Sequence, residues 1–241
     1  MHAAPMMQTD GRTPFAYSGV ATLEAMAEAV NYNTFLLGLV TAQVNADDDI
    51  LDFGAGTGAL ARPLIAAGYR VTCVEPDNKL RAGLEAAGFA AHASLSMCPD
   101  EQFDAIYTFN VLEHIADDAG ALAALSQRLK PGGRLLVYVP AFQVLYSSMD
   151  RLVGHFRRYR KSGLRQAIGA AGLRVDSIGY VDSLGFFAGL LFRAIGNDQG
   201  TINRRGLIAY DRGAFPLSRR VDRLTGRWLG KNLFAVARRT G

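Results

Sequence analysis

A short segment of glycines and acidic residues has the types and spacing needed to bind a nucleotide-like ligand. Asp52 lies in the apolar run 51–53, and the glycine-rich stretch Gly54–Gly58 follows directly. Glycines between a strand and a helix let the backbone turn sharply and approach a ligand with its free N–H groups. Glu75 lies about 20 residues further on, where a carboxylate can accept hydrogen bonds from both hydroxyls of a ribose. The spacing therefore predicts a site for an adenosine-containing cofactor.

Two classes of cofactor fit these glycines. Gly54, Gly56 and Ala59 satisfy the G-x-G-x-x-A pattern of dinucleotide-binding proteins, so an NAD(P)-dependent oxidoreductase is one alternative. Asp52 favours S-adenosylmethionine instead, because a carboxylate at this position suits the positively charged amino acid part of that molecule. Dinucleotide enzymes usually have an apolar residue there.

A second group of polar residues follows the apolar run 134–139, the expected fifth strand. These residues would lie at the carboxyl edge of the sheet, where open α/β folds bind ligands. Arginines can hold an anion through two parallel hydrogen bonds, and a histidine can accept a proton. We expect this segment to contact the substrate that would accept a methyl group from S-adenosylmethionine, called the acceptor below. The alternative is a loop held by arginine pairs to acids such as Asp150. The residues expected at the acceptor are Tyr146, Arg157, Arg158 and Tyr159, with His155 as a catalytic residue.

His114 is the other candidate for proton transfer, because it follows directly after the fourth expected strand. The alternative is a hydrogen-bonded structural histidine. Cys73 and Cys98 do not have the spacing of metal ligands, and no metal site is predicted.

Short apolar runs alternate with helical stretches along most of the chain, which predicts a parallel sheet with helices on both faces. Glycines such as Gly68 and Gly88 end helices, and Asp117 has the character of a helix N-cap. A helical stretch at 20–44 precedes the first strand. The expected strands are 49–53, 70–75, a weak 89–92, 103–109, 134–139, 173–180 and 233–238, and the expected later helices are 60–67, 78–87, 117–129 and 161–171.

Four segments in this order resemble the class I S-adenosylmethionine-dependent methyltransferases, in their type 11/12/23-like branch. They are LDFGAGTG at 51–58, FDAIYTFNVLEHIADD at 103–118, LKPGGRLLVYVPA at 129–141 and GHFRRY at 154–159. The resemblance covers nearly the whole chain. It implies an α/β, doubly wound, Rossmann-like fold with a seven-stranded sheet, an antiparallel last strand and a cap inserted between the last two strands. It also implies methyl transfer from S-adenosylmethionine.

The resemblance further implies which residues surround the donor. Its methionine part would lie on the glycine loop, its ribose at the end of the second strand, and a lid from the N-terminal region would cover it. The matching residues are Asp52, Gly54, Ala55 and Gly56 on the loop; Glu75 and Pro76 at the ribose; Ser94 and Leu95 beside the adenine; Asn110 and Val111 after the fourth strand; and Tyr17, Tyr32 and Asn33 in the lid.

We expect a single domain over residues 1–241, because this length suits one domain with additions. Within it we distinguish a helical lid (14–46), a donor-binding core (47–180), a cap (181–230) and a closing strand (231–241). No secretory leader is visible, so a cytoplasmic location is expected.

The charge is unevenly distributed along the chain. Residues 1–149 have 8 Lys and Arg against 16 Asp and Glu, whereas residues 150–241 have 18 against 6. A basic C-terminal part suits a small-molecule acceptor that is anionic or amphiphilic, and it equally suits a solvated arginine-rich surface. We expect the apolar side chains of the run 184–195 to be buried within the cap; the alternatives are that they cover an apolar acceptor, form a homodimer contact or rest on a membrane surface. A nucleic-acid partner is the least favoured, because no aromatic-and-basic RNA-binding module is evident.

Overall fold

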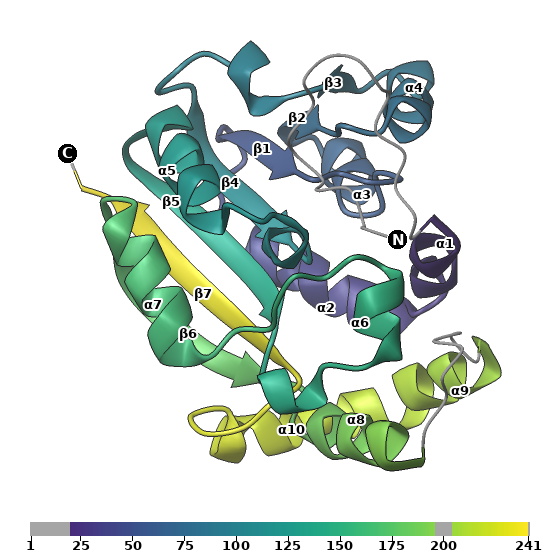
Figure 1. Cartoon of the computed structure of the whole chain (residues 1–241). Coiled ribbons are helices and arrows are strands. Elements are labelled where there is room, and N and C mark those ends of the chain that lie inside the picture. The colour runs from purple at the N-terminus through teal and green to yellow at the C-terminus, as the bar shows by residue number, and fades with distance from the viewer. Residues whose placement is uncertain (1–19, 196–203, 241) are drawn as a thin grey trace.

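The computed structural model describes residues 20–195 and 204–240 and contains a seven-stranded sheet in the order β3-β2-β1-β4-β5-β7-β6 (Figure 1). Strand β7 runs antiparallel to both of its neighbours, and the other pairings are parallel. This confirms the predicted fold class. The strands are β1 (Asp49–Phe53), β2 (Arg70–Val74), β3 (Ala90–His92), β4 (Phe103–Phe109), β5 (Leu129–Pro140), β6 (Leu173–Val181) and β7 (Asn232–Arg239).

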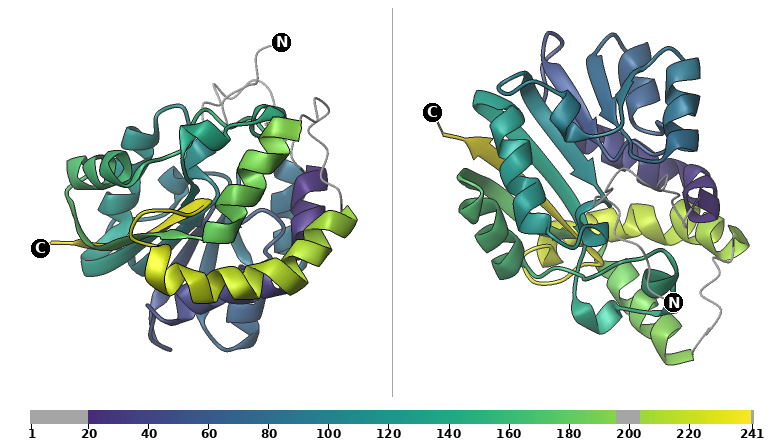
Figure 2. Two further views of the ribbon diagram at one scale, coloured as in Figure 1. Left: turned by 90° about the horizontal axis from the view of Figure 1, so that it is seen from below. Right: turned by 45° about the horizontal axis from the view of Figure 1, so that its top comes forward.

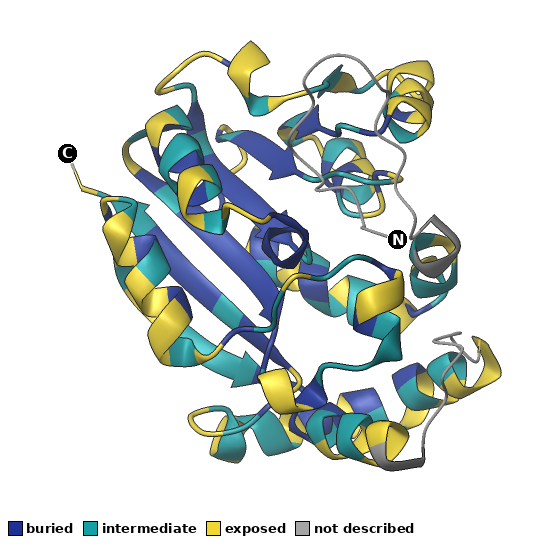
Figure 3. Cartoon of the chain, in the orientation of Figure 1, coloured by how far each residue is buried: buried dark blue, intermediate teal, exposed yellow. Residues whose placement is uncertain are grey.

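Helices cover both faces of the sheet. On one face, α5 and α7 pack on side chains such as Ile106 and Val137. On the other face, α2, α3 and α4 pack on side chains such as Ile50 and Tyr138. The central strands are buried almost throughout, as Figure 3 shows. The helices are α1 (Val20–Ala27), α2 (Val30–Thr41), α3 (Ala61–Ala66), α4 (Asn78–Ala86), α5 (Asp118–Arg128), α6 (Ser148–Leu152), α7 (Lys161–Ala170), α8 (Ser183–Ile195), α9 (Arg204–Ala209) and α10 (Phe215–Thr225).

Two elements differ from the expectation. The stretch 20–44 forms two helices, α1 and α2, with a break at residues 28 and 29. Strand β5 begins at Leu129, five residues earlier than expected, and bulges before it pairs regularly with β4 from Arg134. Gly133 lies in this bulge, where a Cβ atom would come within 2.9 Å of the Lys130 carbonyl oxygen, so the close approach of two backbones requires glycine.

The segment between β6 and β7 is helical. Helices α9 and α10 form one continuous helical stretch, interrupted by a single π-helical turn (η4, Tyr210–Ala214), and α8 packs beside α10 (Figure 2). Helix α10 contacts both α2 and β6, which places this segment at the same end of the molecule as the lid helices.

The apolar cluster on α8 is less buried than a cap interior would be. Phe187 and Leu191 have 56% and 60% of their surface exposed, and Phe192 has 37%. The expectation that these side chains are simply buried in the cap is therefore wrong for these three residues. Among residues 20–195 and 204–240, no helix combines the length and the apolar composition needed to cross a membrane.

Candidate functional site

A cavity of about 310 Å³ opens at the carboxyl ends of the central strands. Helices α1 and α2 line one side of it, and residues of η4 and α10 line another. Nine of the residues predicted to bind the donor line this cavity: Tyr32, Asn33, Asp52, Gly54, Ala55, Gly56, Glu75, Asn110 and Val111.

The glycine loop turns directly away from the sheet after β1. The N–H groups of Gly54 and Ala55 donate to the Val74 carbonyl oxygen at 2.9 and 3.1 Å, which ties the loop to β2. Gly54 has φ +86°, and a Cβ atom there would lie 2.4 Å from a methyl group of Val111. Glycine is therefore needed at this position both for the backbone conformation and for the approach of the segment after β4.

Glu75 is held at the end of β2 by two main-chain groups. The Gly56 N–H donates to Oε2 at 2.7 Å and the Asp77 N–H donates to Oε1 at 2.9 Å. Burial raises the pKa of Glu75. Each carboxylate oxygen has a further lone pair, so the side chain can still accept two hydrogen bonds from hydroxyls in the cavity.

Asp52 is a buried acid that lines the cavity without a cationic partner among the described residues. Burial raises its pKa to about 7. A buried carboxylate is stabilised in its charged form by an opposite charge nearby. Asp52 thus fits the methionine part of S-adenosylmethionine, whose ammonium group would supply the missing positive charge.

The lid helix α2 contacts the loop after β4. The Asn110 amide donates to the Tyr32 hydroxyl at 3.3 Å, and the Asn33 amide donates to the Met26 carbonyl oxygen at 2.9 Å, which joins α2 to α1. Asn110 has φ +57°, a left-handed conformation that is uncommon outside glycine and that occurs often at functional sites. Tyr17 lies outside the described residues.

The N-terminus of α2 is capped by a residue far away in the chain. The carboxylate of Asp211, in η4, accepts hydrogen bonds from the N–H groups of Asn31 at 3.0 Å and Tyr32 at 2.8 Å. Ala29, at the N-cap position, has no side chain able to do this. The π-helical turn therefore fastens the inserted segment to the lid.

Three residues predicted at the donor do not line the cavity. Pro76 lies beside Glu75 but is not among the residues that line the cavity, and Ser94 and Leu95 lie at the short helical turn after β3. The Ser94 hydroxyl is hydrogen-bonded to the Ser96 hydroxyl at 2.7 Å. The adenine role assigned to these two residues stays a prediction.

The other end of the cavity is built around a buried carboxylate. Asp150 is 1% exposed and accepts hydrogen bonds from Arg158 Nε at 2.8 Å and Arg158 Nη2 at 3.0 Å. Its Oδ1 also lies 2.7 Å from His155 Nδ1. Burial alone would raise the pKa of Asp150, but the hydrogen bonds from His155 and Arg158 hold it well below its usual value. Asp150 thus stays ionised and orients both partners.

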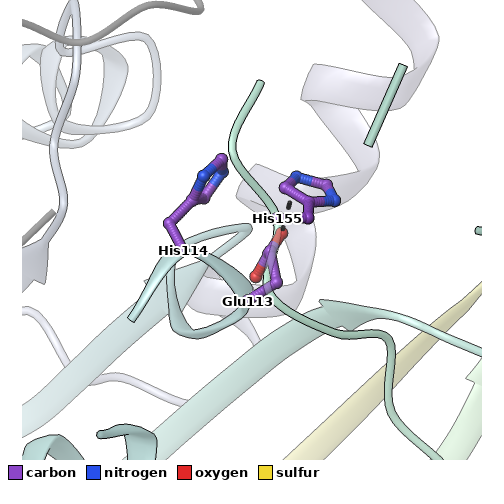
Figure 4. Close-up of side chains that lie close together, drawn as sticks. All are labelled: Glu113, His114 and His155. Carbon is purple, nitrogen blue, oxygen red and sulfur yellow. Dashed lines mark ion pairs between the residues drawn. The ribbon is translucent and has the colours of Figure 1, made fainter. Parts of the chain in front are cut away.

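Glu113 and His114 lie against His155, because the Phe156 N–H donates to the Glu113 carbonyl oxygen at 2.8 Å and brings the two segments together. The His155 Nε2 atom lies 3.9 Å from Glu113 Oε1, and the His114 and His155 rings meet edge to face at 4.5 Å between centroids (Figure 4). Burial raises the pKa of Glu113 to about 7. Burial and the neighbouring His155 lower the pKa of His114 to about 3, so His114 is neutral at physiological pH and a weak base.

The remaining residues predicted to contact the acceptor are engaged elsewhere. Arg157 Nη1 lies 2.6 Å from Asp118 Oδ1, and the Tyr159 hydroxyl donates to Asp118 Oδ2 at 2.6 Å. The Tyr146 hydroxyl donates to the His155 carbonyl oxygen at 2.6 Å. None of these three residues lines the cavity, whereas Arg158 does. The structure contains the arginine–acid pairs of the alternative interpretation, and contact of these residues with an acceptor stays a prediction.

Sequence analysis missed polar cavity residues on the late part of the chain. Asp182 lies at the end of β6 and accepts a hydrogen bond from the Tyr210 hydroxyl at 2.5 Å. Lys231 also lines the cavity, where burial lowers its pKa and the charge of Asp182 opposes that effect. These residues stand alone in stretches with no motif, so spacing could not have indicated them.

Comparison with known proteins agrees with this geometry. Residues 24–178 match the family described as "Methyltransferase domain", which is more than half of the chain. A ubiquinone biosynthesis O-methyltransferase from Paramagnetospirillum magneticum is 34% identical over 92 residues, which are 35% of this chain and 37% of that protein. The match thus spans little more than a third of the relative's length.

Solved structures share the fold across most of the chain. A chain in the complex between the Haloferax volcanii Trm112 methyltransferase activator and a methyltransferase superposes with a TM-score of 0.65 at 16% identity, covering 93% of this chain and 97% of that one. A SAM-dependent methyltransferase from Archaeoglobus fulgidus gives a TM-score of 0.59 at 16% identity, with 88% and 94% covered.

The oxidoreductase alternative is wrong. Dinucleotide-binding sheets of the doubly wound type place their strands in the order 3-2-1-4-5-6, whereas here an antiparallel β7 lies between β5 and β6. The strand order, the glycine loop with Asp52 and Glu75, and the family match agree, and the chain belongs to the class I S-adenosylmethionine-dependent methyltransferases.

Proposed function

We propose that this chain transfers the methyl group of S-adenosylmethionine to a hydroxyl of a small-molecule acceptor. The observation that carries the proposal is that a single cavity joins the donor residues Asp52 and Glu75 to the polar cluster of Glu113, His114 and His155. An acceptor bound at that cluster would therefore lie next to the donor without a barrier between them.

The donor end would hold and shield the cofactor. When bound, S-adenosylmethionine supplies a methyl group activated by its sulfonium. Asp52 would pair with the ammonium group, Glu75 would accept hydrogen bonds from the ribose hydroxyls, and α2 with Tyr32 would exclude water. Methyl transfer depends mainly on such alignment and on the exclusion of water.

The acceptor end combines apolar walls with a polar corner. Met26, Phe109, Val153 and Phe215 offer apolar surface for the body of a small molecule, and the cluster of Glu113, His114 and His155 offers polar contacts for its reacting group. A neutral hydroxyl must lose a proton as it is methylated. We propose that this loss takes place at the cluster. The name of the O-methyltransferase relative supports an oxygen nucleophile.

Two measurements test the proposal. Calorimetric titration of the full chain should show binding of S-adenosylmethionine and S-adenosylhomocysteine and no binding of NAD. Incubation with radiolabelled donor and a panel of hydroxylated aromatic compounds should then move label into a small molecule. His155→Gln should lower turnover at least about 100-fold while donor affinity persists.

His92→Gln is the matched control, since His92 lies on β3 outside the cavity lining. It should behave as the wild type in both measurements. Label that enters only nucleic acid or protein would contradict a small-molecule acceptor, and failure to bind either form of the donor would contradict the proposed function itself.

A further inference from the structure

We propose that Glu113, His114 and His155 form a binding site for one divalent transition-metal ion of the Zn²⁺ type, at the acceptor end of the cavity. The role given to the ion rests on the proposed function, but its binding does not. Each of the three side chains offers one ligand atom, and these atoms lie within 4.8 Å of one another. Figure 4 shows the three side chains grouped together.

The set of ligand atoms suits a transition metal. Two imidazole nitrogens and one carboxylate oxygen are the ligands of catalytic zinc sites of the His₂Glu type and of several other divalent transition ions. Tetrahedral bonds of about 2.1 Å place two ligand atoms about 3.4 Å apart. The widest pair here must therefore approach by up to about 1.4 Å, which requires side-chain rotations on binding. Mg²⁺ and Ca²⁺ prefer oxygen ligands and suit this site poorly.

The carboxylate of Glu113 gives the second, independent observation. Glu113 is 1% exposed, and both of its side-chain oxygens are buried without a hydrogen-bond partner. Buried carboxylate oxygens in native structures are almost always paired or bound to a metal, because leaving them unsatisfied is unfavourable. Arg158, whose charge also acts on Glu113, pairs with Asp150 at 2.8 Å. A divalent cation between Glu113 and the two histidines would satisfy these oxygens.

Groups outside the cluster hydrogen-bond both histidine rings, as is usual for metal-binding histidines. Asp150 lies 2.7 Å from His155 Nδ1, which leaves Nε2 directed toward Glu113 at 3.9 Å. Backbone groups of Val153 and Gly154 hydrogen-bond the His114 ring. A carboxylate or carbonyl behind the imidazole fixes the tautomer and the ring orientation of a metal ligand. Asp150 and Arg158 thus become positioning residues for the metal site.

Three protein ligands leave coordination positions open, and all three line the cavity. An acceptor hydroxyl bound at an open position would lose its proton to solvent, because a divalent ion lowers the pKa of a bound oxygen. That oxygen then forms the new bond to the methyl carbon as the carbon–sulfur bond of the donor breaks, and S-adenosylhomocysteine leaves. Neither histidine needs to act as the base.

The test uses the full chain, purified without a polyhistidine tag and stripped with EDTA. Equilibrium dialysis against Zn²⁺ followed by elemental analysis should show about one ion per chain, as for a single three-ligand site. Co²⁺ in place of Zn²⁺ should give the visible absorption of a low-coordinate nitrogen and oxygen site. Glu113→Gln and His155→Gln should each weaken binding at least about 100-fold, at or beyond the 10–100-fold typical of outer-shell losses. His92→Gln should bind as the wild type does.

Wild-type protein that takes up neither ion overturns the metal inference, as does equal loss of binding in His92→Gln. Titration of the same samples with S-adenosylhomocysteine separates the two proposals: donor binding without metal leaves the proposed function intact and returns proton transfer to His155. Metal binding without donor binding leaves the metal inference intact and contradicts the proposed function. If a variant fails to fold, the Co²⁺ spectrum of the wild type still shows whether the chain binds a metal ion through nitrogen and oxygen ligands.

Discussion

The two ends of the cavity are built in different ways. At the donor end, Asp52, the glycine loop and Glu75 come from 24 consecutive residues, and Glu75 is held by the main-chain N–H groups of Gly56 and Asp77. At the acceptor end, Glu113 comes from one segment and Asp150 and His155 from another, and the three are held by one another's side chains. A site held by the backbone tolerates side-chain changes that a mutually paired site does not. We therefore expect donor-end changes to affect binding and acceptor-end changes to affect folding as well.

The largest effect should follow Asp150→Ala. Removing this carboxylate leaves Arg158, whose side chain is 10% exposed, as a buried charge without its partner. Breaking a buried ion pair in this way destabilises a protein by about 3–5 kcal/mol. Urea unfolding measures the loss. The control is Asp176→Ala, whose more exposed pairs with Arg174 and Arg238 should contribute at most about 1 kcal/mol. Equal losses in both variants would remove the contrast between the two ends.

Glu75→Ala should act mainly on binding. Two ribose hydroxyls would lose a charged acceptor, which weakens donor binding by about 1–3 kcal/mol. The N–H groups of Gly56 and Asp77 also lose their acceptor, so a smaller loss of stability should accompany it. Calorimetric titration with S-adenosylhomocysteine measures the affinity. Wild-type affinity in this variant would show that Glu75 is not at the ribose.

Asp52 should make donor binding depend on pH. Burial raises its pKa to about 7 in the free protein. Only the ionised form attracts the ammonium group, so affinity should fall as the pH falls from 7.5 to 6, approaching tenfold per pH unit well below the pKa. Asp52→Asn should bind more weakly at pH 7.5 and lose most of this dependence. A wild-type affinity that is constant over this range would place the ammonium group elsewhere.

The raised pKa of Asp52 affects the stability of the free protein in the opposite direction: donor affinity rises with pH, whereas stability falls with pH. Because the folded state binds the proton of Asp52 more tightly than the unfolded chain does, this residue's contribution is greatest at low pH and is lost as the pH rises through about 7. The stability difference between Asp52→Asn and the wild type should therefore grow in favour of the variant as the pH rises from about 4 to about 7, and stay constant at higher pH.

The smallest effect should follow Arg157→Ala. Its guanidinium is 35% exposed, pairs with Asp118 and lies outside the cavity lining. We expect a stability loss of at most about 1 kcal/mol and unchanged donor affinity and turnover. Arg158→Ala, the matched change one residue along, should lower both stability and turnover. A loss of turnover in Arg157→Ala with intact stability would restore the substrate contact that the sequence suggested.

These differences also explain what the sequence could predict. The strand boundaries at 49–53 and 103–109 were predicted correctly, because buried strands are continuous apolar runs that end at glycine or polar residues. The positions of Asp52 and Glu75 followed from the same local pattern. The pairing of Asp150 with Arg158 could only be an alternative, since arginine spacing does not show whether an acid or a ligand lies opposite. Glu113 and His155 are 42 residues apart, and only the backbone contact between 113 and 156 brings them together.

The hydrogen bonds from Asn31 and Tyr32 to Asp211 have a thermodynamic consequence. They join the cover of the donor end to the inserted helical segment, whose residues also line the acceptor end. An acceptor that favours the docked position of this segment must favour the ordered start of α2 as well. By thermodynamic linkage, the bound acceptor then raises the affinity for the donor by the same factor by which the bound donor raises the affinity for the acceptor. We therefore expect occupancy of each end to favour occupancy of the other, through the single carboxylate that caps α2.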